Sequence, residues 1–207
     1  MATVPGGKTE GTSMTALRIP RKFTVREYLL IEDQAETKSE FYEGEIFAMA
    51  GASPRHNIIF SNVFSELCNR LKGKKCRSFG SDQRVRISRS GLFTYPDMLI
   101  VCDNPIYDPI DPNSLINPAV LVEILSPSTE KYDRGFKLKQ YQNIETVQEI
   151  VNISQDTPLV EVHIRTPHGG WGMLTCRDIL GEFNIPSLKL TIPLAEVYRE
   201  VDYEKPE

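Results

Sequence analysis

Apolar residues recur every four positions in one long segment of the chain, which begins directly after Ser53-Pro54. Serine is a preferred helix N-cap and proline is favoured at the first helical position, so this dipeptide is typical of a helix start. Side chains at this spacing lie on one face of a helix. The apolar positions are Ile59, Val63, Leu67 and Leu71. The pattern predicts a helix over residues 54–72 that ends near Gly73 and buries one face.

Shorter apolar runs elsewhere in the chain predict β-strands. They cover residues 76–79, 83–88, 92–102, 118–125, 147–153, 159–166 and 171–176. A hairpin is predicted with its turn at Glu43-Gly44. Three more helices are predicted, at residues 25–31, at 129–143 and around 192–201. This order of elements predicts an α/β fold in which a central mixed β-sheet is flanked by helices.

Two of the apolar runs each contain one carboxylate. Asp97 comes directly before the run 98–101, and Glu123 lies within the run 119–125. An unpaired ionised carboxylate in an apolar setting is costly, so each acid should have a compensating partner. Side chains alternate between the two faces of a strand. If the two strands pair, Asp97 and Glu123 can point to the same side within a few ångströms of each other.

Two explanations for these acids remain open at this point. A divalent cation such as magnesium prefers carboxylate oxygen ligands and would relieve the repulsion between two neighbouring acids. Alternatively, each acid lies at an edge or pairs with an arginine such as Arg84 or Arg86, and its role is structural. Spacing alone does not decide between a metal centre and a structural ion pair.

Length and composition limit the kinds of protein that the chain can be. The 207 residues are 40% hydrophobic, enough to bury the core of one domain over residues 21–207. Residues 1–20 are rich in Gly, Thr and Ser and are expected to form a flexible leader. No apolar stretch is long enough for a membrane span, and the N-terminus lacks the apolar core of a secretory signal.

Charge and cysteine content refine the expected environment. A net charge of -4 provides no global basic field for nucleic acid. Two local clusters are candidates for a phosphate backbone or are simply solvated surface: Lys72, Lys74, Lys75 and Arg77, and Arg84, Arg86 and Arg89. The four cysteines lack the paired spacing of a zinc site and are expected to be buried reduced thiols, which favours a cytoplasmic protein.

Several motifs together resemble one known family. They are "SEFYEGEIFAMAGASPRHN", "YPDMLIV", "LVEILSPST" and "YDRGFKLKQY". They resemble the Uma family of restriction-endonuclease-like proteins, which is placed in the PD-(D/E)XK nuclease superfamily, and the resemblance covers residues 23–200. It implies a restriction-endonuclease-like fold. It also implies that Asp97 and Glu123 hold Mg (or Mn) for the hydrolysis of DNA phosphodiester bonds.

The chain departs from the superfamily pattern two positions after the second acid. A lysine is expected there, and this chain has Leu125. Lys137, on the following predicted helix, is a candidate replacement, and it shares a helical face with Asp133 and Tyr141 because the three are four residues apart. The alternative is an exposed salt bridge between Asp133 and Lys137 without a role in catalysis.

Other residues are candidates for supporting roles. The resemblance implies that Glu40 could supply a third acid from an N-terminal element, and Glu45 is a second candidate in the same hairpin. His56 matches the family's Ser-Pro-x-His and could be an accessory ligand, a general base or a structural residue at the helix start. Tyr141 completes a Lys-x-x-x-Tyr spacing similar to the Gln-x-x-x-Tyr motif of RecB-like nucleases.

The sequence therefore predicts a magnesium-dependent endonuclease that acts on DNA, with Asp97, Glu123 and Lys137 in catalysis. A homodimer would fit this function, because paired subunits often cut the two strands of a duplex. The main alternative is a nuclease-fold binding or regulatory module that has lost catalysis, which Leu125 favours. A metal-dependent hydrolase for another phosphate substrate is a further alternative.

Overall fold

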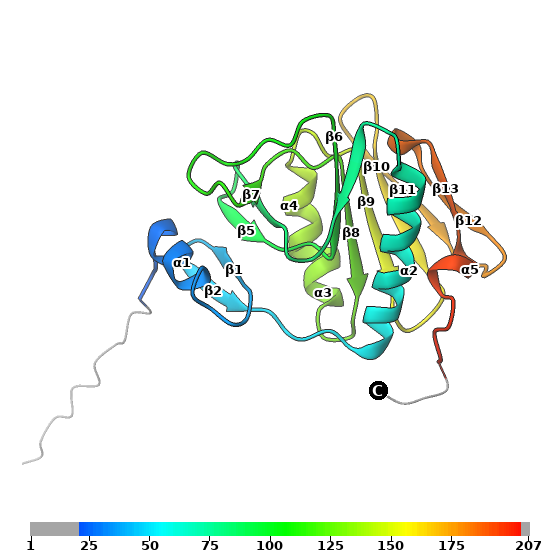
Figure 1. Ribbon diagram of the computed structural model, residues 1–207, viewed down its shortest axis with the longest axis horizontal. Coiled ribbons are helices and arrows are strands. Elements are labelled where there is room, and N and C mark those ends of the chain that lie inside the picture. The colour runs from blue at the N-terminus through cyan, green and yellow to red at the C-terminus, as the bar shows by residue number, and fades with distance from the viewer. Residues whose placement is uncertain (1–20, 204–207) are drawn as a thin grey trace, which may run out of the picture.

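The computed structural model describes residues 21–203, so the predicted leader at 1–20 lies outside the described part of the chain. The largest element is a six-stranded mixed sheet with strand order β11-β10-β9-β8-β6-β3 (Figure 1). Its strands are β3 (Cys76–Phe79), β6 (Met98–Cys102), β8 (Val120–Leu125), β9 (Glu149–Ser154), β10 (Val160–Arg165) and β11 (Trp171–Cys176). β8 and β9 are parallel, and every other pair is antiparallel.

A second sheet of five strands has the order β2-β1-β5-β4-β7. Its strands are β1 (Ser39–Tyr42), β2 (Glu45–Ala48), β4 (Arg84–Ile87), β5 (Leu92–Thr94) and β7 (Ser114–Leu115). The helix α1 (Val25–Glu32) contacts β1 through Tyr28, whose ring stacks on Phe41. The predicted hairpin is confirmed, and its turn is made by Glu43 and Gly44, both with positive φ.

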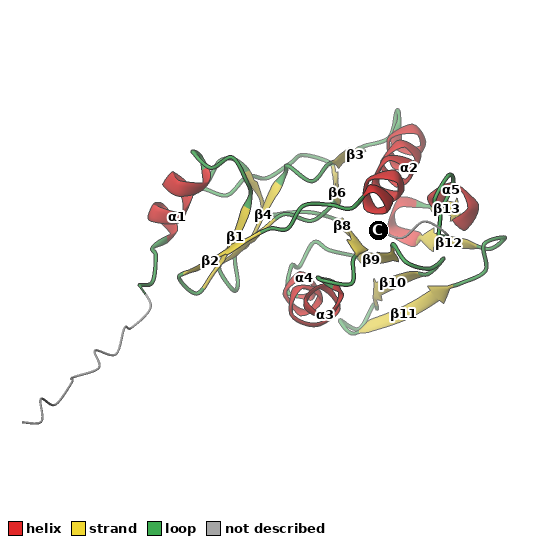
Figure 2. Ribbon diagram, turned by 90° about the horizontal axis from the view of Figure 1, so that it is seen from below, coloured by secondary structure: helices red, strands yellow, loops and turns green. Residues whose placement is uncertain are grey.

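The helix α2 (Pro54–Leu71) covers one face of the six-stranded sheet, as Figure 2 shows. The prediction of a helix over 54–72 is confirmed, with the Ser53 hydroxyl accepting a hydrogen bond from the His56 N–H at its start. The apolar stripe packs onto the alternate positions Val120, Val122 and Ile124 of β8. The hairpin of β12 (Glu182–Ile185) and β13 (Leu190–Pro193) and the short helix α5 (Leu194–Val197) join the same core.

The opposite face is covered by a helical segment that connects the parallel strands β8 and β9 (Figure 2). A crossover of this kind is how parallel neighbours are joined. The predicted helix over 129–143 is interrupted, because α3 (Glu130–Tyr132) and α4 (Leu138–Gln142) are separated by a π-helical turn, Asp133–Lys137. The Leu138 N–H bonds to the carbonyl of Asp133, five residues back. This segment lies over the face of β8 that carries Glu123.

The predicted fold class, an α/β fold with a mixed sheet flanked by helices, is confirmed, but several element boundaries differ. The run 92–102 was expected to be one strand, and Tyr95-Pro96-Asp97 divides it between the two sheets. Proline cannot donate to a strand ladder, which is the physical reason for the break. The helix expected around 192–201 is confined to four residues. Three short strands, β7, β12 and β13, were not predicted.

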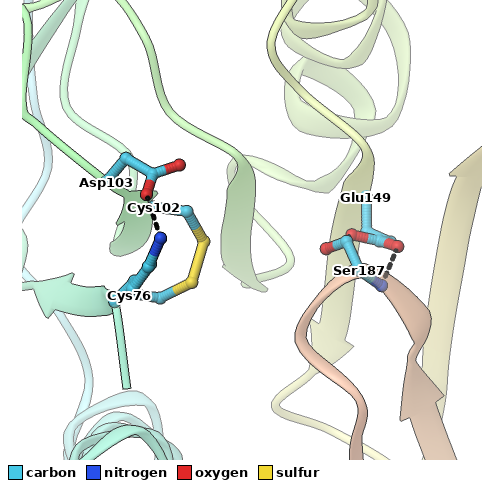
Figure 3. Close-up of a disulfide and its surroundings, with 6 residues drawn as sticks. Cys76, Cys102, Asp103, Glu149 and Ser187 are labelled. Atoms are coloured by element: carbon cyan, nitrogen blue, oxygen red, sulfur yellow. Dashed lines mark hydrogen bonds and ion pairs between the residues drawn. A yellow bond between two sulfur atoms is a disulfide. The ribbon is translucent and has the colours of Figure 1, made fainter. Parts of the chain in front are cut away.

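The expectation of four buried reduced thiols is wrong. Cys76 and Cys102 form a disulfide between β3 and β6 (Figure 3), where the antiparallel register places them directly opposite each other. Cys68 is exposed on α2, and Cys176 is partly buried. The cysteines therefore give no support for a reducing compartment. Within residues 21–203, no helix is both long enough and apolar enough to cross a membrane.

Candidate active site

The two carboxylates picked out in the sequence lie side by side. Asp97 directly precedes β6, and the register of Met98 with Val122 brings it next to Glu123. The charge of Asp97 contributes to the raised pKa of Glu123. Asp97 is held from two sides: its Oδ2 accepts a hydrogen bond of 2.7 Å from the backbone N–H of Ile124, and its Oδ1 is 3.1 Å from Nε2 of His56. Adjacent strands of the sheet and the start of α2 thus fix this acid.

Glu123 is buried beneath the helical segment, with 4% of its surface exposed. The Tyr141 hydroxyl donates a hydrogen bond of 2.5 Å to its Oε1, and the Lys137 Nζ lies 3.0 Å from the same oxygen. Burial raises the pKa of the Glu123 carboxyl, Lys137 opposes this rise, and the nearby charges of Asp97 and Asp133 reinforce it. A cation bound beside Glu123 would therefore displace a proton that the buried site favours.

Lys137 lies at the end of the π-helical turn and points into the site. Its Nζ is 3.4 Å from Oε1 of Glu40 and 3.9 Å from Oδ1 of Asp133, in addition to the Glu123 contact. Burial lowers the pKa of the Lys137 ammonium, but the surrounding acids and Tyr141 outweigh this effect and hold the pKa well above its ordinary value. Lys137 is therefore a buried cation, and the alternative of an exposed salt bridge with Asp133 is wrong.

Glu40 belongs to the same cluster, although it comes from the five-stranded sheet. Its two carboxylate oxygens accept hydrogen bonds from the hydroxyls of Thr94 and Tyr132. Neither Thr94 nor Tyr132 was predicted from the sequence. The pairing of Phe41 with Phe93 places Thr94 opposite Glu40, so correct strand pairing would have identified it. Tyr132 is the first residue of the motif "YDRGFKLKQY" that carried the family resemblance, but no role in the site was assigned to it.

The remaining candidate residues divide clearly between site and surroundings. Glu45 points away from the site: it is 53% exposed and lies 3.8 Å from the Lys22 ammonium. Arg84 and Arg86 do not pair with Asp97 or Glu123. They make buried ion pairs with two acids of the loop after β6, Asp111 and Asp108 respectively. The structural alternative for the two acids therefore has no support in these arginines.

These pairings also bear on the two basic clusters. The second cluster loses Arg84 and Arg86 to buried ion pairs, so it cannot present them to a phosphate backbone. In the first cluster Lys72, Lys74, Lys75 and Arg77 are exposed. Lys75 is near Asp103, which directly follows β6, whereas Asp97 directly precedes β6. This cluster therefore lies at the other end of the strand from the candidate site.

The donor atoms offered by Asp97 and Glu123 fit magnesium or manganese. Both supply hard carboxylate oxygens, and Mg²⁺ usually keeps several waters and binds through one or two carboxylates. Among the described residues, no group of three or more His, Cys, Asp or Glu side chains is placed to hold a metal ion. Glu40 is already held by Lys137, Thr94 and Tyr132. The candidate metal site therefore consists of two carboxylates, and the other ligands of a bound ion would have to be waters.

Comparison with known proteins places this geometry in context. A family model described as "Uma2: Putative restriction endonuclease" matches residues 25–197. Two uncharacterized proteins of Synechocystis sp. are similar along most of their length. One is 30% identical over 181 residues, which cover 86% of this chain and 92% of the relative. The other is 32% identical over 169 residues, which cover 82% of this chain and 94% of the relative.

A solved structure has the same fold. It is the crystal structure of "a putative nuclease belonging to DUF820" from Anabaena variabilis, and it matches with a TM-score of 0.70 at 21% sequence identity. The match covers 85% of this chain and 97% of that structure. At this level of identity the likeness supports the fold, and the chemistry has to be argued from the residues of this chain.

Proposed function

Because this chain belongs to the Uma2 family of restriction-endonuclease-like proteins, we propose that it is a magnesium-dependent nuclease that hydrolyses DNA phosphodiester bonds. The observation that carries the proposal is the convergence of a buried cation and two neighbouring acids. Lys137 Nζ lies 3.0 Å from Glu123, and Asp97 lies near Glu123, directly before the neighbouring strand β6. The acids could be explained separately, but the three groups together form a site suited to phosphoryl chemistry.

Asp97 and Glu123 would hold the divalent ion. When bound, the ion would activate a water and stabilise negative charge on the scissile phosphate. The protein supplies the fixed geometry around it. His56 and the Ile124 N–H hold Asp97, while Tyr141 holds Glu123 from the helical side. Rigid support of this kind keeps carboxylate ligands in place without reorganisation during the reaction.

Lys137 would supply the positive charge that the superfamily pattern places two residues after the second acid. Leu125 occupies that position and lies on the same face of β8 as Glu123, because the two are separated by one residue. Lys137 reaches this face from the π-helical turn above it. π-helical turns are rare and occur frequently at functional sites. The geometry thus supports a lysine displaced from the strand to the helix.

A nuclease-fold binding module that has lost catalysis is the second candidate, since Leu125 cannot provide a charge. One feature of the site favours it: Lys137 is held by Glu123, Glu40 and Asp133 and could act as a purely structural counter-ion. Such a module would bind DNA without cutting it.

A cleavage assay separates the two candidates. Single-stranded and double-stranded DNA are incubated with the protein in Mg²⁺, in Mn²⁺ and in EDTA. We expect metal-dependent cleavage by the wild type and its loss in Asp97→Asn and Glu123→Gln. Glu45→Gln is the matched control, because Glu45 is an exposed acid outside the site. Metal-dependent DNA binding without cleavage would replace the nuclease proposal with the binding module. The same duplex assay with sized protein fractions tests whether a homodimer cuts both strands.

A further inference from the structure

A buried asparagine lies next to Glu123 on the side away from Asp97. Asn152 of β9 is the register partner of Glu123 in the parallel pair of β8 and β9. Register partners point to the same face of a sheet, and neighbouring strands are about 4.8 Å apart. Glu123 and Asn152 therefore lie side by side on the face covered by the helical segment, and Asp97, directly before β6, lies on the other side of Glu123.

The amide nitrogen of Asn152, Nδ2, has no hydrogen-bond acceptor within the described part of the chain. Only 2% of the residue is exposed, and its Nδ2 is buried without an acceptor. A buried donor left unsatisfied destabilises the folded state, so such groups in native structures call for an explanation. The unsatisfied Nδ2 of Asn152 is explained if this donor forms a hydrogen bond in another state of the site.

Glu123 offers the complementary acceptor. Both of its contacts, from Tyr141 and Lys137, go to Oε1, and no described residue donates to its Oε2. An ionised carboxylate has about four acceptor positions on its two oxygens, so it can accept the amide and a metal ion at the same time. The donor and the acceptor belong to direct neighbours in the sheet, so both side chains lie on the same face of adjacent strands.

We propose that Asn152 is a positioning residue for Glu123, whose amide donates a hydrogen bond to the Glu123 carboxylate when a divalent ion is bound. This inference rests on the proposed function, because it requires the ion at Asp97 and Glu123. Partners that orient a metal ligand in this way typically change metal affinity or activity by about 10–100-fold when they are removed. Asn152 would thus contribute to metal binding without touching the ion.

Asn62 provides a matched control on the other face of the sheet. It is also a buried asparagine, but its Nδ2 is satisfied by the carbonyls of Val197 at 3.1 Å and Arg199 at 2.8 Å. Its Oδ1 also accepts a hydrogen bond from Arg199, so replacing it by leucine, which has a similar shape, removes three hydrogen bonds from a purely structural residue. The same replacement at Asn152 removes an unsatisfied donor. The two variants should therefore have opposite effects on the stability of the metal-free protein.

The experiment compares Asn152→Leu, Asn62→Leu, Glu123→Gln and the wild type by thermal unfolding in EDTA and by calorimetric titration with Mn²⁺. For Asn152→Leu we expect an unfolding temperature equal to or above that of the wild type, and a Kd for Mn²⁺ at least tenfold weaker. For Asn62→Leu we expect a lower unfolding temperature and an unchanged Kd. Asn152→Ala is the second variant and should weaken Mn²⁺ binding in the same way if the leucine variant does not fold.

The outcomes distinguish this inference from the proposed function. If Glu123→Gln abolishes Mn²⁺ binding but both Asn152 variants bind it as tightly as the wild type, the positioning role is wrong and the metal centre stands. That result would be expected if a buried water satisfies the amide. If the wild type binds no Mn²⁺, the metal centre itself is wrong and the role of Asn152 is overturned with it.

Discussion

Replacing Lys137 by methionine removes the only cation that contacts three buried acids at once among the residues described. Methionine retains an unbranched apolar chain, so the main change is the loss of the ammonium group. Its Nζ lies 3.0, 3.4 and 3.9 Å from the carboxylates of Glu123, Glu40 and Asp133. At an effective dielectric constant of about 20, two unit charges 3.0 Å apart attract each other by about 5.5 kcal/mol.

The net effect is smaller than the sum of these attractions. The variant no longer has to desolvate an ammonium, and one or more of the acids can become protonated, which burial already favours for Glu123. Breaking a buried ion pair by removing one partner typically costs about 3–5 kcal/mol. We expect a decrease of this size in the free energy of unfolding at pH 8. The decrease should be smaller at pH 5, because protonated acids no longer need a counter-ion.

Urea unfolding in EDTA at the two pH values measures this effect. Lys139→Met is the matched control, since Lys139 is exposed and lies two residues further along the same helical segment. It should stay within about 0.5 kcal/mol of the wild type. Adding Mg²⁺ should recover part of the stability of Lys137→Met, because an ion that binds the folded state stabilises it. A Lys137→Met variant as stable as the wild type at pH 8 would show that Lys137 is not the counter-ion of the cluster.

Three further predictions concern the same regions. Lys137→Met should also lose DNA cleavage, and adding Leu125→Lys to it should restore part of that cleavage; no recovery would show that the site needs more than a positive charge near Glu123. Tyr141→Phe should lower the free energy of unfolding by about 1–3 kcal/mol and reduce cleavage without abolishing it, whereas full stability and activity would refute the role of the hydroxyl. Burial raises the pKa of Glu149, which Figure 3 labels. The wild type should therefore lose stability relative to Glu149→Gln as the pH rises from 4 to 7, as measured by urea unfolding. Parallel pH profiles of the two proteins would contradict this.

The sequence was sufficient for those parts of the fold that depend on local pattern. The α2 stripe and its Ser53-Pro54 start define the helix almost to the residue. The neighbouring positions of Asp97 and Glu123 followed from alternation along two apolar runs. The helix signal lies within one short segment of chain, whereas the proximity of the two acids also required the two strands to pair, as β6 and β8 do.

Features that depend on pairing between distant strands could not be predicted. Cys76 and Cys102 are 26 residues apart, and only the register of β3 with β6 brings them together. Arg84 and Arg86 were considered as partners for the acids of the site or for DNA, and they are paired instead with a loop whose path no periodic pattern indicates. The unsatisfied amide of Asn152 is likewise visible only in the folded chain.

The π-helical turn is a third kind of feature. Lys137 and Tyr141 were predicted to share a face with Asp133 from ideal α-helical spacing. The structure brings all three to the site, but through a segment with one hydrogen bond spanning five residues. Helical periodicity therefore predicted which side chains face the sheet, and it could not predict the local geometry that sets their height above it.

The central claim is that Asp97 and Glu123 together hold one divalent ion. It is tested most directly by crystals of the wild type and of Asp97→Asn soaked in Mn²⁺, with the ion located by its anomalous scattering. The account predicts one strong peak in the wild type, within bonding distance of oxygens from both acids, and no peak there in Asp97→Asn. A wild type without a peak between the two acids, or a peak that persists unchanged in Asp97→Asn, would contradict it.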